Sequence, residues 1–201
     1  PVPLEPMTLA TEVVRGGRRI QFVDASLSLV DRTVARAHGV GVRRATHEVP
    51  FGAPPSNIRL TPEDSPPVNF FENPGAMATD AMEVRMADGD FDKPGSGAAW
   101  FRMKVPVTDD HDLTPVEATC ASSDFANGVS NLDPDFTWMF INTELTIHFG
   151  RPPVGEWILV DSTSWLFDSG SGMSSSVLAD RAGIFGRTAQ SLLVEPFRGR
   201  S

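Results

Sequence analysis

Only one segment of the chain, residues 114–128, has the pattern of a helix, and it lies between segments that alternate like strands. Thr114 and Glu117 form a T-x-x-E capping box with Pro115 at the first helical position, and Gly128 predicts the stop. The apolar face predicted for this helix comprises Val116, Cys120, Ala121 and Phe125. One helix among many strands indicates an α+β fold in which a long antiparallel sheet packs on that helix.

Alternating apolar and polar residues predict strands on both sides of the helix. The strands expected before it cover 7–15, 18–29, 33–43, 81–88 and 98–106, and those after it cover 136–149, 156–167, 173–180 and 184–195. Gly16-Gly17 predicts a two-residue hairpin turn between the first two strands. Seventeen prolines and seventeen glycines suit many short elements joined by turns.

The strands fall into two blocks, residues 1–44 and 81–201, joined by a predicted linker over residues 45–80 that is rich in Pro, Asn and Gly. Phe70-Phe71 is expected to anchor this linker to a surface, with a ligand contact as the alternative. The first block has no helix to cover its apolar face, and the chain begins on Pro1-Val2-Pro3-Leu4 without Met. We therefore expect that an N-terminal part is missing.

Charge and cysteine usage exclude several classes of function. The formal net charge of the 201 residues is −9, which disfavours nucleic-acid binding, and no apolar run approaches the roughly 18–20 residues of a membrane span. Cys120 is the only cysteine, so no intrachain disulfide forms, and no signal-like segment is present. The four histidines are scattered without metal-ligand spacing. These features predict a cytoplasmic protein with no metal site.

Four segments carry a family resemblance: PVPLEPMTLATEVVRGGRRIQFVDASL (1–27), SSDFANGVS (122–130), FINTELTIHFGRPPVGEW (140–157) and SVLADRAGIFGRTAQSLLV (176–194). Together they resemble the double-hotdog acyl-CoA thioesterases of the type II thioesterase superfamily, especially its bacterial branch. The resemblance implies a curved antiparallel sheet around a central helix. It makes residues 81–201 a complete second hotdog and residues 1–44 the last strands of a first hotdog that lacks its first strand and helix here. It also implies a homodimer or higher homo-oligomer and no cofactor.

The enzymes that the chain resembles use neither a covalent nucleophile nor a metal. They hold a water with an Asp from the second central helix, a Thr or other hydrogen-bonding side chain from the next strand, and a Gln from the last strand. The matching residues here are Asp124, Asn142 and Gln190. Asp124 falls in the last turn of the predicted helix, where the dipole disfavours an acid, and we expect burial to raise its pKa. A solvated Asp at a helix end is the alternative.

Asn142 departs from the family pattern, because Asn cannot replace a hydroxyl in every geometry. Thr143 is the alternative donor, but neighbouring strand residues point to opposite faces, so the two cannot serve by the same geometry. Asn142 can also be a plain strand residue, and Gln190 can lie on a solvent-facing side. Glu144 and His148 share the polar side of the same strand. We assign them supporting and structural roles, because the motifs of hotdog dehydratases are not convincing in this sequence.

The sequence leaves the substrate contacts open. Candidate contacts for the coenzyme A phosphates are Arg59, Arg151, Arg181 and Arg187, and candidate walls of an acyl channel are Phe125, Trp138, Phe140 and Trp165. The leading hypothesis is hydrolysis of acyl-CoA thioesters to free acid and coenzyme A by an Asp-activated water. The alternatives are a non-catalytic hotdog module that binds acyl-CoA or fatty acid, and a structural fragment with no site of its own.

Overall fold

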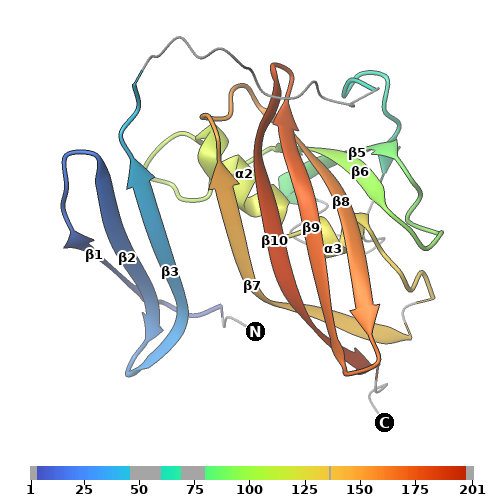
Figure 1. The fold of residues 1–201 in the computed structure, drawn as a ribbon, viewed down its shortest axis with the longest axis horizontal. Coiled ribbons are helices and arrows are strands. Elements are labelled where there is room, and N and C mark those ends of the chain that lie inside the picture. The colour runs from blue at the N-terminus through green and yellow to red at the C-terminus, as the bar shows by residue number, and fades with distance from the viewer. Residues whose placement is uncertain (1–3, 46–59, 69–79, 136, 198–201) are drawn as a thin grey trace. The chain divides into compact units, whose positions relative to one another are not determined.

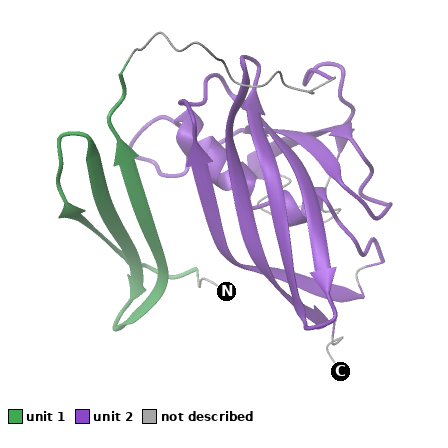
Figure 2. Cartoon of the chain, viewed as in Figure 1, with its two compact units in different colours: residues 1–52 green, residues 53–201 purple. Residues whose placement is uncertain are grey.

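The computed structural model describes residues 4–45, 60–68, 80–135 and 137–197, which form the ribbon in Figure 1. They belong to two compact units, residues 1–52 and residues 53–201 (Figure 2). Two sequence-based expectations, the anchor Phe70-Phe71 and the phosphate contact Arg59, lie outside the described residues.

The first unit contains a three-stranded antiparallel sheet in the order β1-β2-β3. Its strands are Thr8–Arg15, Ile20–Leu29 and Arg32–Val42. The predicted two-residue turn at Gly16-Gly17 is wrong, because the loop spans residues 16–19 and the register shifts between Val13 and Arg15. No described residue among 4–45 is fully buried. A three-stranded sheet needs a hydrophobic face that packs on another layer to be stable in water.

The second unit is built on a seven-stranded antiparallel sheet in the order β4-β5-β6-β8-β9-β10-β7. Its strands are Pro67–Val68 (β4), Met82–Asp88 (β5), Gly97–Met103 (β6), Trp138–Phe149 (β7), Trp157–Phe167 (β8), Ser171–Asp180 (β9) and Gly183–Pro196 (β10). Each strand expected from the alternation is present, with bounds that differ by a few residues. In Figure 1 the helices of this unit lie behind β7 to β10.

Two helices replace the single one expected: α2, Pro115–Ser123, and α3, Ala126–Val129. The capping box is confirmed, since the Thr114 side chain accepts from the Glu117 N–H and Glu117 accepts from the Thr114 N–H at 2.8 Å. Hydrogen bonds from Thr114 and His111 hold the pKa of Glu117 at about 2. The stop predicted at Gly128 is wrong, because the chain turns at Phe125, whose ring lies 5.5 Å from that of Phe101, and Gly128 lies inside α3.

The buried face of α2 also differs from the predicted one. The residues of α2 that are buried are Ala118, Thr119, Ser122 and Ser123, whereas Cys120 is exposed and Val116 is 44% exposed. Ala121 and Phe125 are half-buried against the core, as expected. Thr119 and Ser122 tolerate burial because each hydroxyl donates to the carbonyl four residues earlier, at 2.7 Å. Small side chains, two of which have their hydroxyls satisfied inside the helix, thus take the place of the expected apolar stripe.

Hydroxyl groups continue across the sheet beneath α3. Ser130 Oγ lies 3.0 Å from Ser162 Oγ and 2.6 Å from Ser164 Oγ, and Ser162 Oγ lies 3.0 Å from Ser174 Oγ. Ser130, Ser162 and Ser174 are buried. Beside this polar strip lies the main apolar cluster, which comprises Met82, Val84, Met86, Ala99, Phe101, Ala118, Ala126, Val129, Ile158, Val160, Leu178 and Phe185.

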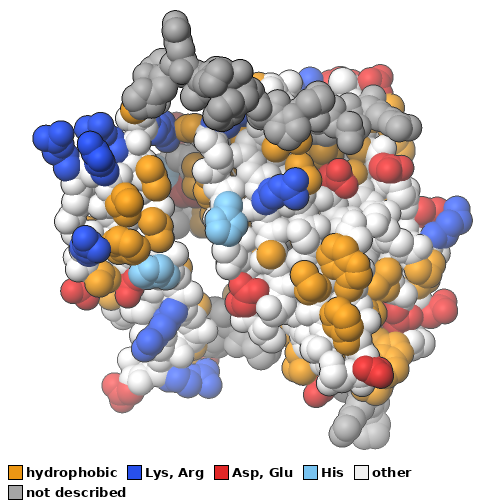
Figure 3. All heavy atoms as spheres, viewed as in Figure 1, with side chains coloured by type: hydrophobic (Ala, Val, Ile, Leu, Met, Phe, Trp, Pro, Cys, Tyr) orange, Lys and Arg blue, Asp and Glu red, His pale blue; other side chains and the backbone are white. Residues whose placement is uncertain are grey.

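The outer face of the sheet is covered at β5 and β6 and open at β7 to β10. Residues 60–66 cover β5 and β6, where Trp100 Nε1 donates to the Leu60 carbonyl at 3.0 Å and Arg85 to the Pro62 carbonyl at 3.0 Å. At the open end, five large apolar side chains are each 41–54% exposed: Ile141, Trp165, Phe167, Met173 and Leu193. Figure 3 shows hydrophobic side chains gathered on this face. Among the described residues, no helix is long and apolar enough to cross a membrane.

Candidate functional site

The structure brings the side chains of Asp124 and Asn142 together. Asp124 caps the C-terminus of α2, and the Asn142 Nδ2 group on β7 donates a hydrogen bond to Asp124 Oδ1. Asn142 is half-buried, whereas Asp124 is exposed, so the expected burial of this carboxylate is wrong. The break between α2 and α3 explains the exposure, because the chain leaves the helix at Asp124 and only resumes helical geometry at Ala126.

A register shift between β7 and β10 turns Asn142 toward the helix. Gln190 pairs with Leu145 and Ser191 with Glu144, but Leu192 pairs with Asn142, so Thr143 is an extra residue on β7. Along β10, Gln190 and Leu192 are buried and their neighbours are exposed, which marks the inner face of this strand. Asn142 is on the inner face because it lies opposite Leu192. A bulge of this kind re-aims a side chain at one point of a strand.

Thr143, the alternative to Asn142, has a different contact. It is exposed, and its Oγ1 donates to the Ser191 carbonyl at 3.1 Å. Its neighbour Glu144 is exposed as well and accepts from the Ser191 N–H at 2.8 Å. The structure therefore places Asn142, and not Thr143, beside Asp124.

Gln190 reaches the same end of α2 from the inner face of β10. It is 2% exposed, and its Nε2 donates to the carbonyls of Ser123 at 3.3 Å and Asp124 at 3.2 Å. These carbonyls belong to the end of the helix, where main-chain acceptors need partners from outside the helix. Donation from Nε2 turns Oε1 the other way, and within the described part of the chain this buried Oε1 has no hydrogen-bond partner. Ser123 Oγ is also buried and likewise has no hydrogen-bond partner among the described residues.

A cavity of about 430 Å³ begins two residues beyond the Asn142–Leu192 pair on β7 and β10. Phe140 and Val194 line it and face each other across β7 and β10, in register with the Asn142–Leu192 pair. Two positions along a strand span roughly 7 Å. The remaining lining residues are Leu132, Asp133, Thr137, Trp138, Leu166, Phe167 and Asp168. Of the four expected channel walls, Trp138 and Phe140 line this cavity, whereas Phe125 packs on Phe101 and Trp165 is 44% exposed.

The arginines proposed for phosphate contact have other positions or partners. Arg151 donates to both carboxylate oxygens of Asp180 at 2.7 Å, and Arg181 pairs with Glu63 at 2.9 Å. Arg187 is exposed on β10, on the side opposite to Gln190. Of the three candidate arginines that lie in the described residues, two are thus engaged in ion pairs of the fold.

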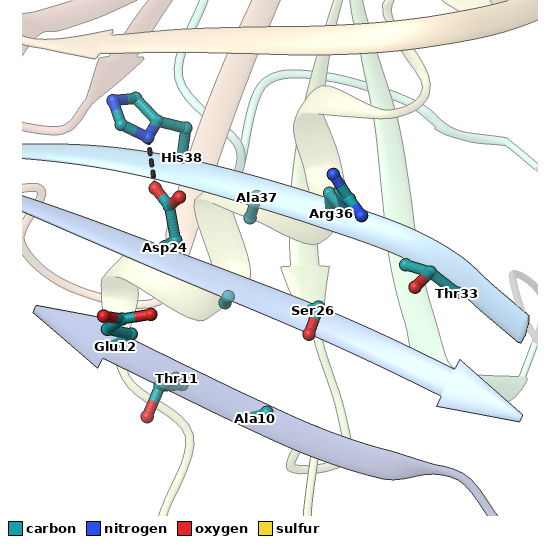
Figure 4. A pocket seen from close by; sticks show the side chains of 10 residues that line it. Ala10, Thr11, Glu12, Asp24, Ser26, Thr33, Arg36, Ala37 and His38 are labelled. Carbon is teal, nitrogen blue, oxygen red and sulfur yellow. Dashed lines mark hydrogen bonds and ion pairs between the residues drawn. The ribbon is translucent and has the colours of Figure 1, made fainter. Parts of the chain in front are cut away.

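The first unit has a row of polar side chains that no sequence pattern marks. Glu12, Asp24 and His38 lie opposite one another on β1, β2 and β3, and His38 Nδ1 and Asp24 Oδ1 share a hydrogen bond (Figure 4). The row lines a cavity of about 510 Å³. Only the spatial register reveals it, because the three residues are far apart in the sequence. Across the described ranges, no three His, Cys, Asp or Glu residues are arranged to hold a metal ion.

Three solved structures share the fold of this chain at low sequence identity. The acyl-CoA thioesterase II TesB2 of Mycobacterium marinum is 19% identical, with a TM-score of 0.68 over 98% of this chain and 76% of that one. A conserved hot dog fold protein of Alicyclobacillus acidocaldarius is 18% identical, with a TM-score of 0.70 over 96% and 74%. A putative thioesterase II of Thermobifida fusca is 17% identical, with a TM-score of 0.72 over 93% and 71%.

These likenesses confirm the predicted hotdog fold, a long antiparallel sheet with the helices on one face. Among curated proteins, none matches the chain. The sequence model of one family, the acyl-CoA thioesterase C-terminal domain, matches residues 62–194. That range holds α2, α3 and all the strands from β4 to β9, together with Asp124, Asn142 and Gln190. The chain therefore belongs to the acyl-CoA thioesterase family, and its matched part is the C-terminal domain of that family.

Proposed function

We propose that the protein hydrolyses acyl-CoA thioesters to a free acid and coenzyme A by means of a water that Asp124 activates. The observation that supports this most is the convergence of Asp124, Asn142 and Gln190 on the end of α2. Thioester hydrolysis needs an oriented water, a group that takes its proton, and a donor for the developing oxyanion. The three side chains can supply each of these without a covalent nucleophile.

In this proposal the water lies against the Asp124 carboxylate, to which one of its hydrogens points. Gln190 donates to the carbonyls of Ser123 and Asp124, so it fixes the end of α2 that carries this carboxylate. A water held in this way directs a lone pair at the thioester carbonyl carbon. Asp124 takes the proton as the carbon–oxygen bond forms, the tetrahedral intermediate expels the coenzyme A thiolate, and that thiolate takes up a proton.

Asn142 has two roles in the proposal. An amide NH₂ group has two hydrogens, and one of them is donated to Asp124 Oδ1. This bond fixes the carboxylate so that its other oxygen faces the water. The second hydrogen can be donated to the thioester oxygen, where negative charge develops. Both functions require donors, and the NH₂ group of Asn has two hydrogens where a hydroxyl has one.

The direct test is a panel of acyl-CoAs of increasing chain length, assayed for release of free coenzyme A. The proposal expects turnover of at least part of the panel by the full chain. If acyl-CoAs bind, as measured by calorimetry, but none is hydrolysed, the non-catalytic binding module is the correct reading. If none binds, both the hydrolase and the binding-module hypotheses are wrong, and the structural fragment is left.

The cavity beyond Asn142 is the proposed site of the acyl chain, because aromatic and aliphatic side chains line most of it. Val194→Phe would fill it from the inner face of β10, where Val194 is 8% exposed. We expect kcat/KM to fall by about fourfold for each methylene that no longer fits, and short substrates to be unaffected. Chain-length profiles of the two proteins measure this. Leu193→Phe, one residue away on the outer face, is the matched control. An equal loss for short and long substrates would place the acyl chain elsewhere.

Three further expectations belong to this proposal. We propose that residues 1–44 are the last strands of a first hotdog, and that the chain forms a homodimer or higher oligomer in the cytoplasm. The exposed apolar side chains on the outer face of β7 to β10 support self-association, since patches of this kind commonly mark interfaces. Sedimentation at the monomer mass would contradict the oligomer, and cell fractionation tests the location.

A further inference from the structure

The carboxylate of Glu144 holds β7 and β10 together beside the register shift. Its Oε1 accepts from the Ser191 N–H at 2.8 Å and from the Ser191 Oγ at 3.0 Å, and its Oε2 accepts from Thr146 Oγ1 at 3.1 Å. Thr143 Oγ1 adds a bond to the Ser191 carbonyl at 3.1 Å. Ser191 is thus tied to β7 through its N–H, its carbonyl and its hydroxyl, and it directly follows Gln190.

The register shift decides which residue of β7 faces α2. If the ladder ran on regularly from the Glu144–Ser191 pair, Thr143 would lie opposite Leu192 and Asn142 opposite Leu193. Leu192 is 4% exposed and Leu193 is 41% exposed, so these positions belong to opposite faces of the sheet. In a regular ladder Thr143 would therefore face α2 and Asn142 would face outward, because a slip of one residue exchanges the faces.

We propose that Glu144 is a positioning residue that clamps Ser191, locks this register shift, and thereby selects Asn142 rather than Thr143 as the partner of Asp124. The inference rests on the proposed function for its catalytic meaning, but its structural part stands by itself. Hydrogen bonds from a main-chain N–H and a hydroxyl to a carboxylate are charge-assisted and stronger than neutral ones. Glu144 thus supplies a side-chain acceptor to Ser191 at the point where the extra residue Thr143 interrupts the regular ladder.

The structural part can be tested without any activity. The side-chain amide signals of Asn142 in a ¹H–¹⁵N correlation spectrum are assigned by their loss in Asn142→Ala. We expect Glu144→Ala to move these signals to the position of a solvent-exposed amide. Thr146→Val removes only the Oε2 contact, and Glu195→Ala removes an exposed carboxylate from β10, so both should leave the signals in place. Unmoved signals in Glu144→Ala would overturn the inference.

If Glu144→Ala does not fold, the milder variant Glu144→Gln still tests the inference. Glu144→Gln keeps the shape and one oxygen acceptor but removes the charge, so we expect exchange between two positions of the Asn142 amide signals. The far-ultraviolet circular dichroism of each variant reports whether the sheet is intact. If Glu144→Gln folds and its Asn142 side-chain amide signals stay where they are in the unmodified chain, without exchange, the role of Glu144 is also contradicted.

The catalytic part is tested by exchanging the roles of two residues. In the unmodified chain, Asn142→Ala should lower kcat/KM by about ten- to a hundredfold, as expected for a hydrogen bond to a charged group, and by more than Thr143→Val does. In the Glu144→Ala background the order should reverse. A residue with a merely structural role would lower both values and keep their order, which would refute the selection of Asn142 by Glu144. Because the amide signals need no turnover, an inactive protein would contradict the proposed function alone.

Discussion

Asp124→Asn is expected to lower kcat for acyl-CoA hydrolysis by about 10²–10⁴-fold while the chain stays folded. Asn has nearly the same shape as Asp, and its oxygen can still accept the bond from Asn142 Nδ2. It cannot take a proton from water at neutral pH, so the loss falls on the chemical step. Because Asp124 is exposed, the substitution leaves no buried charge or cavity.

The measurement is release of the coenzyme A thiol, followed with a thiol reagent. Because Cys120 is an exposed thiol, the signal of the protein without substrate is recorded first and subtracted. The matched control is Asp135→Asn, which makes the same change of charge at another exposed position. We expect the control to keep full activity. If Asp124→Asn retained more than about a tenth of kcat, Asp124 would not be the general base.

The order of the elements was predictable from the sequence because alternation reports directly which face of a strand is buried. The period-2 pattern located every strand from β5 to β10, and the capping box at Thr114 located the start of α2. Hydrophobic pattern served less well within α2. Thr119 and Ser122 are buried with their hydroxyls bonded inside the helix, and a pattern that scores them as polar assigns them to the wrong face.

The proximity of the three site residues was expected from the family resemblance, but the geometry that produces it was not. Asn142, Glu144, Thr146 and His148 alternate in sequence as if they shared one face. The extra residue at Thr143 separates Asn142 from the other three, and no local pattern marks such a shift, because it depends on the pairing with β10. The pairing of Arg151 with Asp180 is hidden for the same reason, since the two residues are 29 positions apart.

Asp180→Asn is expected to destabilise the second unit by about 1–3 kcal/mol, the cost of leaving buried hydrogen-bond donors without an acceptor. The Asp180 side chain is fully buried and accepts two bonds from Arg151 at 2.7 Å. It also accepts from the N–H groups of Val154 at 2.9 Å and Ala182 at 2.8 Å. The carboxylate thus joins the turn after β7 to the turn after β9, and an amide cannot accept all four bonds.

Urea unfolding, followed by the fluorescence of the tryptophans, measures this loss. Glu63→Gln provides the matched control, because it removes a carboxylate from another arginine pair, in which Arg181 and Glu63 are both exposed. We expect the control to leave the free energy of unfolding almost unchanged, since exposed ion pairs contribute little. Equal effects of the two substitutions would mean that the Asp180 pair is not a determinant of stability.

The penalty for Asp180→Asn should also depend on pH. Burial alone would raise the pKa of Asp180, but the bonds from Arg151 and from the N–H groups of Val154 and Ala182 outweigh it and hold the pKa below its usual value. A carboxyl with a lowered pKa in the folded state stabilises the fold above its unfolded pKa of about 3.9. This stabilisation is lost as the pH falls through the folded pKa. The difference in unfolding free energy between the unmodified chain and Asp180→Asn should therefore be constant near neutrality and shrink below about pH 4. A difference that grew in acid would show that the pKa of Asp180 is raised.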